Sequence, residues 1–280
     1  MTLVDALKTY RYYLLLCLLM LTIVYLSIVP PMVKDWYTDG NYSHGFIIPL
    51  IAGYFLYERR NALQKIFVEP WGPGLLVIIL GLVQLTVAWL GTEYFTMRLS
   101  LVVLMAGMVL YFFGREVFKI ALLPISYLIF MVPLPYIIYD AMAFPLKLFV
   151  TKVSVGVLSS VGVVVLREGN IIMFPTTTLE VADACSGIRS LMSLLALSVA
   201  YAFFVNTTTV KRWIIIASAI PIAIFTNSLR VIVTGILAQY WGAKAAEGFF
   251  HEFAGMVVFA LAMVMLVALG AILGKRSDGS

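Results

Sequence analysis

The sequence predicts an all-α polytopic membrane protein, and its composition is the first reason. Of the 280 residues, 62% are hydrophobic and 12% are charged, and the mean hydropathy is +1.03. A soluble domain carries about 25% charged residues, and so apolar a chain has too few polar groups to cover its surface in water. The composition therefore excludes a soluble enzyme with a tail anchor, a nucleic-acid-binding domain and a disulfide-stapled secreted module.

Eight apolar runs are predicted to cross the bilayer, because each approaches the roughly 20 residues that a spanning helix needs. The predicted spans are residues 12–30, 44–57, 74–91, 99–113, 120–137, 186–205, 213–240 and 253–273. The first ends in Val29-Pro30-Pro31 without a small-residue cleavage site, which is typical of a retained signal anchor. The second is short. No internal repeat or linker divides the chain, so residues 1–280 are predicted to form one domain.

The stretch 138–184, between the fifth and sixth spans, has a different pattern. Its first part is amphipathic and contains Lys147 and Lys152, so it is expected to lie at the outer interface or to enter the membrane and return. Its second part places the turn sequence 167–170 between two apolar runs, which predicts a short β-hairpin outside the membrane.

The distribution of charge orients this map. With both termini in the cytoplasm and 138–184 outside, the inner segments hold eleven basic and five acidic residues, and the remainder holds eight and nine. Cytoplasmic loops of membrane proteins are enriched in Lys and Arg. A full span at 145–166 would instead turn the basic pairs 211–212 and 275–276 outward. We therefore predict a multi-pass protein of the cytoplasmic (inner) membrane with both termini inside.

Ionisable groups within spans are costly and are functional candidates. Arg230 lies seventeen residues after Trp213 in the seventh span. If Trp213 marks the inner interface, Arg230 is about 25 Å along a core of about 30 Å, near the outer face. Asn227 is one turn earlier on the same helical face. Cys185 begins the sixth span at the same membrane face, with Arg189 one turn deeper.

Histidines complete the set of polar groups at the outer face. His251 begins the last span and His44 begins the second. Taken singly, each of these residues has a structural explanation, such as a salt bridge, a helix cap or an ordered loop. Their convergence at one face favours a site. Cys17, in the middle of a span, is interpreted as an apolar filler, and no disulfide with Cys185 is expected.

These groups suit acyl transfer through a thioester. A thiol has a reference pKa of about 8.5 and reacts as the thiolate, which a helix N-terminus or a nearby cation favours. Arg189 and Arg230 favour the Cys185 thiolate, whereas Asp183 and Glu180 oppose it, and the sequence leaves this balance open. His251 can exchange a proton near neutral pH, and a fixed guanidinium can stabilise an oxyanion.

The motifs resemble those of the exosortase and archaeosortase family of integral membrane cysteine transpeptidase-like enzymes. The likeness extends from about Trp36 to about Gly270 and depends on the order of several short motifs. They are Ala-Cys-Ser-Gly-Ile-Arg-Ser-Leu at 184–191, Asn-Ser-Leu-Arg-Val at 227–231, His251 with Gly255, Asn-Tyr-Ser-His-Gly at 41–45, and Arg-Glu-Gly-Asn at 167–170 leading to Leu-Glu-Val at 179–181.

The resemblance implies roles for three residues. Cys185 would be the nucleophile, Arg230 a proton donor or charge stabiliser, and His251 a base or transition-state stabiliser, with the division between the last two left open. Arg189, Asn227, His44 and Glu180 are predicted as supporting residues.

The family also implies the substrate and the partners. Family substrates are exported proteins that end in a Pro-Glu-Pro-like motif, a transmembrane helix and a basic cluster, and in bacteria such enzymes accompany exopolysaccharide systems. Cleavage would occur at the outer face, in contact with membrane lipids and without a metal, another cofactor or nucleic acid.

Two other functions remain open from the residues alone. A transporter or flippase for an anionic or lipid-linked glycan would depend on Arg230 but not on Cys185. A membrane metalloprotease would use His44, His251, Cys185 and an acid. The His-Glu pair at 251–252 is not followed by the second histidine of a His-Glu-x-x-His motif, so the ligand spacing argues against it.

Overall fold

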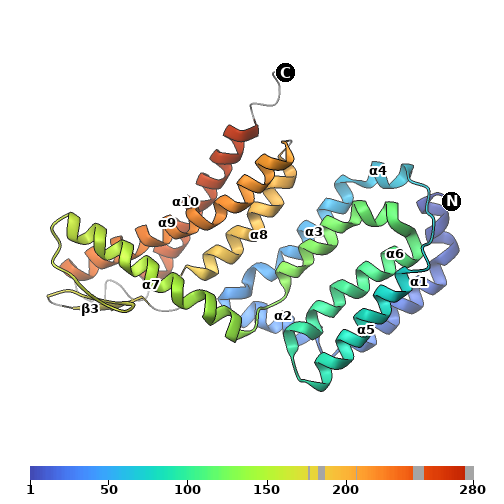
Figure 1. The fold of residues 1–280 in the computed structure, drawn as a ribbon, viewed down its shortest axis with the longest axis horizontal. Helices are drawn as coiled ribbons and strands as arrows, with labels where there is room; N and C mark the ends of the chain where they lie inside the picture. Colours follow the sequence, from blue (N-terminus) through green and yellow to red (C-terminus); the bar gives the residue numbers. More distant parts are fainter. Residues whose placement is uncertain (176, 182–186, 206, 242–248, 275–280) are drawn as a thin grey trace. The chain divides into compact units, whose positions relative to one another are not determined.

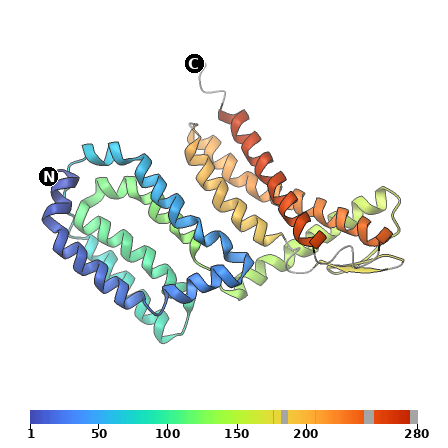
Figure 2. The ribbon, with the colours of Figure 1, turned by 180° about the vertical axis from the view of Figure 1, so that it is seen from behind.

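The structure is a computed structural model of an α-helical, multi-pass membrane protein (Figures 1 and 2). It describes residues 1–280 apart from 176, 182–186, 206, 242–248 and 275–280, and it describes residues 249–252 by their helical backbone alone. The chain forms two compact units, Met1–Pro135 and Tyr136–Ser280. Each unit is described by itself below.

The N-terminal unit is entirely helical in its regular elements. They are α1 (Leu3–Tyr25), α2 (Val29–Thr38), the 3-10 helix η1 (Gly40–Phe46), α3 (Ile48–Glu58), α4 (Arg60–Lys65), α5 (Gly74–Leu90), α6 (Tyr94–Tyr127) and the 3-10 helix η2 (Leu128–Met131). The predicted second span, 44–57, corresponds to η1 and α3. Pro49 lies in the first turn of α3, and eleven residues at 1.5 Å each make this helix only about 16 Å long.

Gly114 divides α6 into two halves. Its backbone is not helical (φ 82°, ψ −175°), a conformation that residues with a Cβ rarely adopt. A Cβ at this position would also overlap the carbonyl oxygen of Glu69. The break therefore falls between the predicted spans 99–113 and 120–137, and only glycine fits there.

Each half of α6 packs against a different helix. Against the first half, α5 packs closely because Gly81 faces Leu104 and Gly107 faces Ile78. Against the second half, α3 brings Phe55 into an edge-to-face contact with Tyr127, with ring centroids 5.5 Å apart. Small residues allow close approach of helices in membranes, where no hydrophobic force joins them.

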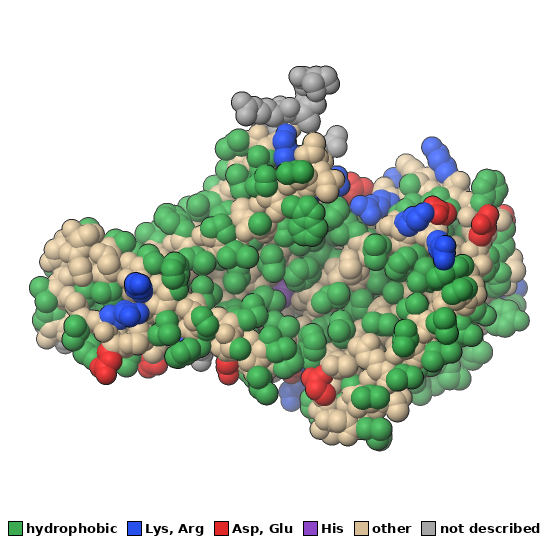
Figure 3. Space-filling model, viewed as in Figure 1, with side chains coloured by type: hydrophobic (Ala, Val, Ile, Leu, Met, Phe, Trp, Pro, Cys, Tyr) green, Lys and Arg blue, Asp and Glu red, His purple; other side chains and the backbone are tan. Residues whose placement is uncertain are grey.

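The N-terminal unit has a basic end and a polar end. At the basic end, the N–H of Val68 donates to the Met1 carbonyl (2.8 Å), which holds the chain terminus in place. At the same end, Arg59, which follows α3, donates to the Ile120 carbonyl of α6 (3.1 Å). The opposite end holds α2, η1 and the start of α6. On the molecular face in Figure 3, hydrophobic side chains dominate and charged ones gather in small groups.

The described residues of the C-terminal unit form four helices and a small sheet. Its elements are α7 (Tyr136–Ser160), β1 (Leu166–Glu168), β2 (Ile171–Met173), β3 (Thr178–Glu180), α8 (Ile188–Phe204), α9 (Thr209–Trp241) and α10 (Phe249–Gly274). Helices α8, α9 and α10 share a buried core that includes Leu194, Ala219 and Leu266. Lys211, near the start of α9, donates to the Leu273 carbonyl at the end of α10 (2.8 Å), as a cation at a helix C-terminus does.

Helix α7 crosses one end of this bundle (Figures 1 and 2). Near its start, Tyr139 and Ala143 pack against Ile188, the first residue of α8. Eleven residues after Ala143, the Ser154 hydroxyl donates to the Ser228 carbonyl of α9 (3.4 Å). The amphipathic segment predicted between the fifth and sixth spans is thus one continuous helix up to Ser160.

Five described helices are long and apolar enough to cross a membrane. They are Leu3–Tyr25, Tyr94–Met131, Tyr136–Ser160, Thr209–Trp241 and Phe253–Gly274, and Gly74–Leu90 and Ile188–Phe204 are shorter apolar helices. The multi-pass class is confirmed. The number of spans, the orientation and the single-domain organisation stay predictions.

The sheet is antiparallel, in the order β1-β2-β3. Its apolar side chains Ile172 and Phe174 pack against Val150 and Leu158 of α7 and Val231 of α9. The hairpin was predicted over the residues of the first two strands. The third strand, β3, was not predicted.

Candidate active site

Helix α9 carries the polar centre of the C-terminal unit. Arg230 is 9% exposed and Asn227 is 2% exposed, and their spacing of three residues places them on one helical face. The neighbouring hydroxyls are satisfied within the helix, since Thr226 donates to the Ile222 carbonyl (2.9 Å) and Ser228 to the Ile224 carbonyl (2.8 Å). A buried guanidinium and a buried amide are therefore the distinctive groups of this face.

Helix α10 approaches Arg230 through a glycine. A methyl group built on Gly255 would lie 3.4 Å from Nη2 and 3.5 Å from Cζ of Arg230. The guanidinium thus occupies space that a larger side chain on α10 would need. His251 lies one turn before Gly255 in the same helix, which places the two positions on one face of α10. The side chain of His251 lies outside the described part of the structure.

Helix α8 approaches Asn227 through another glycine. Gly187 is the N-cap residue of α8 in the left-handed region (φ 79°, ψ −5°). A Cβ there would lie 2.8 Å from both Cγ and Nδ2 of Asn227. Cys185, two residues earlier in the sequence, lies outside the described residues. The start of α8, the middle of α9 and the first turns of α10 thus meet around Asn227 and Arg230.

The predicted supporting residues Arg189 and Glu180 occupy exposed positions. Arg189 is exposed in the first turn of α8, whereas Ile188 beside it is fully buried. Glu180 ends β3, where its carboxylate accepts a hydrogen bond from Asn170 Nδ2 (3.4 Å). Both positions are thus more exposed than those of Asn227 and Arg230.

His44 belongs to the N-terminal unit. It lies in η1, within the range of the predicted second span. The following residue, Gly45, has no room for a Cβ, which would lie 2.5 Å from the Trp36 indole nitrogen. Tight packing of this loop agrees with the loop-ordering role that the sequence also suggested for His44.

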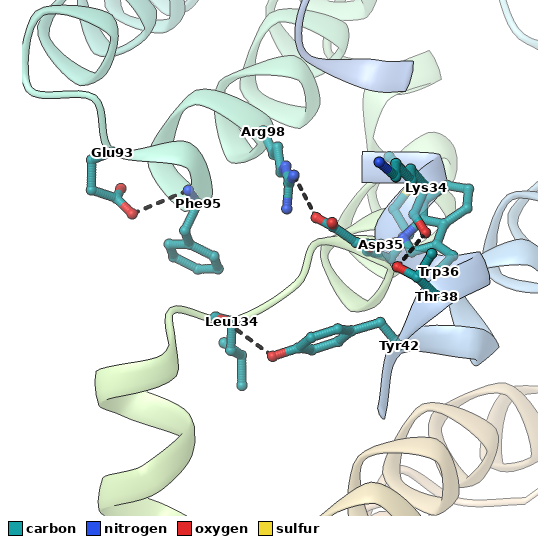
Figure 4. Close-up of polar contacts among 10 residues, drawn as sticks. Lys34, Asp35, Trp36, Thr38, Tyr42, Glu93, Phe95, Arg98 and Leu134 are labelled. Atoms are coloured by element: carbon teal, nitrogen blue, oxygen red, sulfur yellow. Dashed lines mark hydrogen bonds and ion pairs between the residues drawn. The ribbon is translucent and has the colours of Figure 1, made fainter. Parts of the chain in front are cut away.

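A partly buried ion pair beside this loop was not predicted from the sequence. Arg98 Nη2 lies 2.6 Å from Asp35 Oδ2, with the Arg98 side chain 8% exposed and that of Asp35 41% exposed (Figure 4). Nearby, the Tyr42 hydroxyl donates to the Leu134 carbonyl (3.1 Å). Arg98 directly precedes a predicted span, a position where an arginine usually reaches the interface. The sequence therefore gave no sign that this one is buried.

Cys17 is a half-buried free thiol in α1. Within the described ranges, His, Cys, Asp and Glu side chains form no group of three or more that could hold a metal ion.

The fold defines a polytopic α-helical membrane protein, and the contacts define a polar cluster where three of its helices meet. Residues 36–268 match the family model described as transmembrane exosortase, which covers most of the chain. The chain therefore belongs to the transmembrane exosortase family, as the sequence motifs predicted. No curated protein and no solved structure matches the chain.

Proposed function

We propose that the protein is a membrane-embedded cysteine protease or transpeptidase that cleaves C-terminal sorting signals of exported proteins. The observation that carries this proposal is the close approach of Gly187 to Asn227 and of Gly255 to Arg230. Two peptide units separate Cys185 from Gly187, so their Cα atoms are at most about 7–8 Å apart. The proposed nucleophile is thus tied by the chain to the same cluster as the guanidinium.

The reaction needs a nucleophile, a stabilised oxyanion and a proton donor. The Cys185 thiolate adds to a substrate carbonyl carbon, and the carbonyl oxygen takes up the negative charge. When the tetrahedral intermediate collapses, the C–N bond breaks and the leaving amine gains a proton. Cys185 then holds the acyl group as a thioester. Attack by water or by an acceptor amine releases the product and regenerates the thiolate.

Arg230 and His251 are the proposed partners of Cys185. A guanidinium fixed in a site from which water is largely excluded stabilises a developing oxyanion more strongly than one in water. Imidazole exchanges protons near neutral pH. One of the two residues would stabilise charge and the other would transfer the proton, and we leave this division open.

The charge distribution supports a site at the outer face. Basic residues cluster at the end of the C-terminal bundle opposite the polar cluster, with Lys211 at the end of α10 and Arg212 over the Phe203 ring (5.2 Å). By the positive-inside rule this basic end faces the cytoplasm. A substrate helix with its own basic cluster inside would present its preceding motif at the outer face.

The first experiment is co-expression with a tagged membrane protein that ends in a Pro-Glu-Pro-type signal. We expect the intact enzyme to release the C-terminal fragment, seen as a mass shift, and Cys185→Ala to release none. Cys17→Ala is the matched control, because it removes the other thiol of the chain and is expected to process normally. Hydroxylamine, which cleaves thioesters, should release the acyl group from the intact enzyme.

The alternative outcomes separate this proposal from the transporter hypothesis. Equal processing by the intact enzyme and by Cys185→Ala would remove Cys185 as the nucleophile. A cellular phenotype that requires Arg230 but is indifferent to Cys185 would favour transport of an anionic or lipid-linked substrate.

A further inference from the structure

The free edge of β3 presents backbone groups that no described residue pairs. The N–H of Val181 donates to the Asn170 carbonyl (2.9 Å), and the N–H of Phe174 donates to the Thr177 carbonyl (2.8 Å). Bonded and non-bonded pairs alternate along an antiparallel ladder. In this register, where Thr178 pairs with Met173 and Glu180 with Ile171, both residues turn their N–H and C=O groups away from β2.

This edge is exposed, and the sheet that carries it packs on α9, the helix of Asn227 and Arg230. Thr178 and Glu180 are both exposed. The sheet packs on α9 just beyond Arg230, since Phe174 and Val231 share one buried cluster and a Cβ on Gly235 would lie 2.9 Å from Cζ of the Phe174 ring. The last residue of β3 precedes Cys185 by five positions in the sequence.

We propose that the extended segment of the substrate that contains the cleavage site binds as a fourth strand on the free edge of β3. The inference rests on the proposed function, and it adds the mode of recognition. Backbone hydrogen bonds to Thr178 and Glu180 give affinity that does not depend on the side chains of the substrate, as in other cases of strand addition. The bound strand is held beside the chain segment that carries the nucleophile.

A Pro-Glu-Pro motif fits such an edge in one register. Successive residues of a strand direct their N–H groups to opposite sides, so residues two apart share a side. Two prolines flanking a glutamate therefore lack N–H groups on the same side, where a strand can tolerate them only if that side is unpaired. The glutamate N–H and C=O then point toward β3. Recognition of the motif thus follows from the missing donors as well as from the glutamate charge.

The opposite edge of the sheet is a poorer site. In the register of β1 with β2, Leu166 and Glu168 bond to β2, so Arg167 alone directs its backbone groups outward. The Arg167 side chain also bonds back to α7, where Nη1 donates to the Leu148 carbonyl (3.4 Å). The chain offers this second edge as an internal control.

The first test is site-specific photo-crosslinking to uncleaved substrate. A photoreactive amino acid replaces Thr178 or, as the control, Arg167, in a Cys185→Ala background with a tagged Pro-Glu-Pro-type substrate. We expect a crosslinked product from position 178 at several times the yield from position 167. Equal yields, or none from position 178 despite co-purification of the substrate, would overturn the proposal. This test does not require cleavage, so it is separate from the proposed function.

The second test removes one donor from each edge. Thr178→Pro deletes an outward N–H without touching the β2–β3 ladder, and Arg167→Pro does the same on β1. We expect Thr178→Pro to slow processing at low substrate concentration about tenfold, because one hydrogen bond is lost and the ring obstructs the strand. Arg167→Pro should process within about twofold of the unmodified enzyme. If processing depends on Cys185 but the two proline variants are equally active, edge recognition is wrong and the enzyme assignment stands.

Discussion

A side chain at Gly187, at the start of α8, is disfavoured both by the backbone conformation of this residue and by its contact with Asn227. Substitutions can measure these two effects separately. Gly187→Ala places a Cβ on a residue with φ 79°, which costs about 1–2 kcal/mol. The same Cβ would meet Asn227 at 2.8 Å, and overpacking of this kind costs a further 1–3 kcal/mol or so. We therefore expect Gly187→Ala to lower the free energy of unfolding by about 2–5 kcal/mol.

The matched control is Gly162→Ala, between α7 and β1. Gly162 has φ 85°, but a Cβ there meets nothing within 4 Å. It should therefore lose only the backbone part, about 1–2 kcal/mol. Thermal denaturation in detergent measures both, since each kcal/mol shifts the Tm of a protein of this size by about 2–4 °C.

The double variant Gly187→Ala/Asn227→Ala tests the contact itself. Removing the Asn227 amide frees the space that the new methyl needs, so the second substitution should recover part of the loss in a double-mutant cycle. Equal Tm values for Gly187→Ala and Gly162→Ala, with no coupling to Asn227, would refute the contact between α8 and α9 on which the site depends.

Two further predictions concern the other contacts. Gly255→Leu should displace the Arg230 guanidinium and slow processing about 10- to 100-fold. The control is Gly156→Leu, which should keep full activity because a Cβ at Gly156 meets nothing within 4 Å. Equal processing rates for the two variants would contradict the packing of α10 on Arg230. Asp35→Ala should lower the free energy of unfolding by about 1–3 kcal/mol, because it leaves the Arg98 guanidinium buried without its carboxylate. Adding Arg98→Met should restore part of that loss. If the two substitutions instead lower the denaturation midpoint additively, the ion pair between Arg98 and Asp35 is contradicted.

The elements predicted best from sequence are those fixed by local constraints. The membrane class follows from composition, because a chain with 12% charged residues cannot be wetted. The boundary between the predicted spans 99–113 and 120–137 coincides with Gly114, where the structure shows a glycine-only conformation. Asn227 and Arg230 were identified by their polarity within an apolar run, and both are buried.

Other features depend on contacts between distant segments and have no local pattern. Strand β3 has three residues and forms only because β2 is beside it. From the sequence alone, Arg98 is interpreted as an interfacial arginine, because its partner Asp35 lies 63 positions earlier. Helix α7 has apolar length enough for a span, yet it crosses the α8–α9 bundle by packing against Ile188 and Ser228.

The sequence by itself determined that this is a multi-pass helical membrane protein of the exosortase family and which polar residues are candidates for its chemistry. Those properties follow from the cost of placing polar groups in lipid, which each residue carries wherever it lies. Only the tertiary structure decided that glycines on α8 and α10 bring both helices against Asn227 and Arg230, and that the small sheet packs on the same helix, α9. Such juxtapositions arise from the packing of side chains far apart in sequence, and the periodicity of a single helix does not encode its partner.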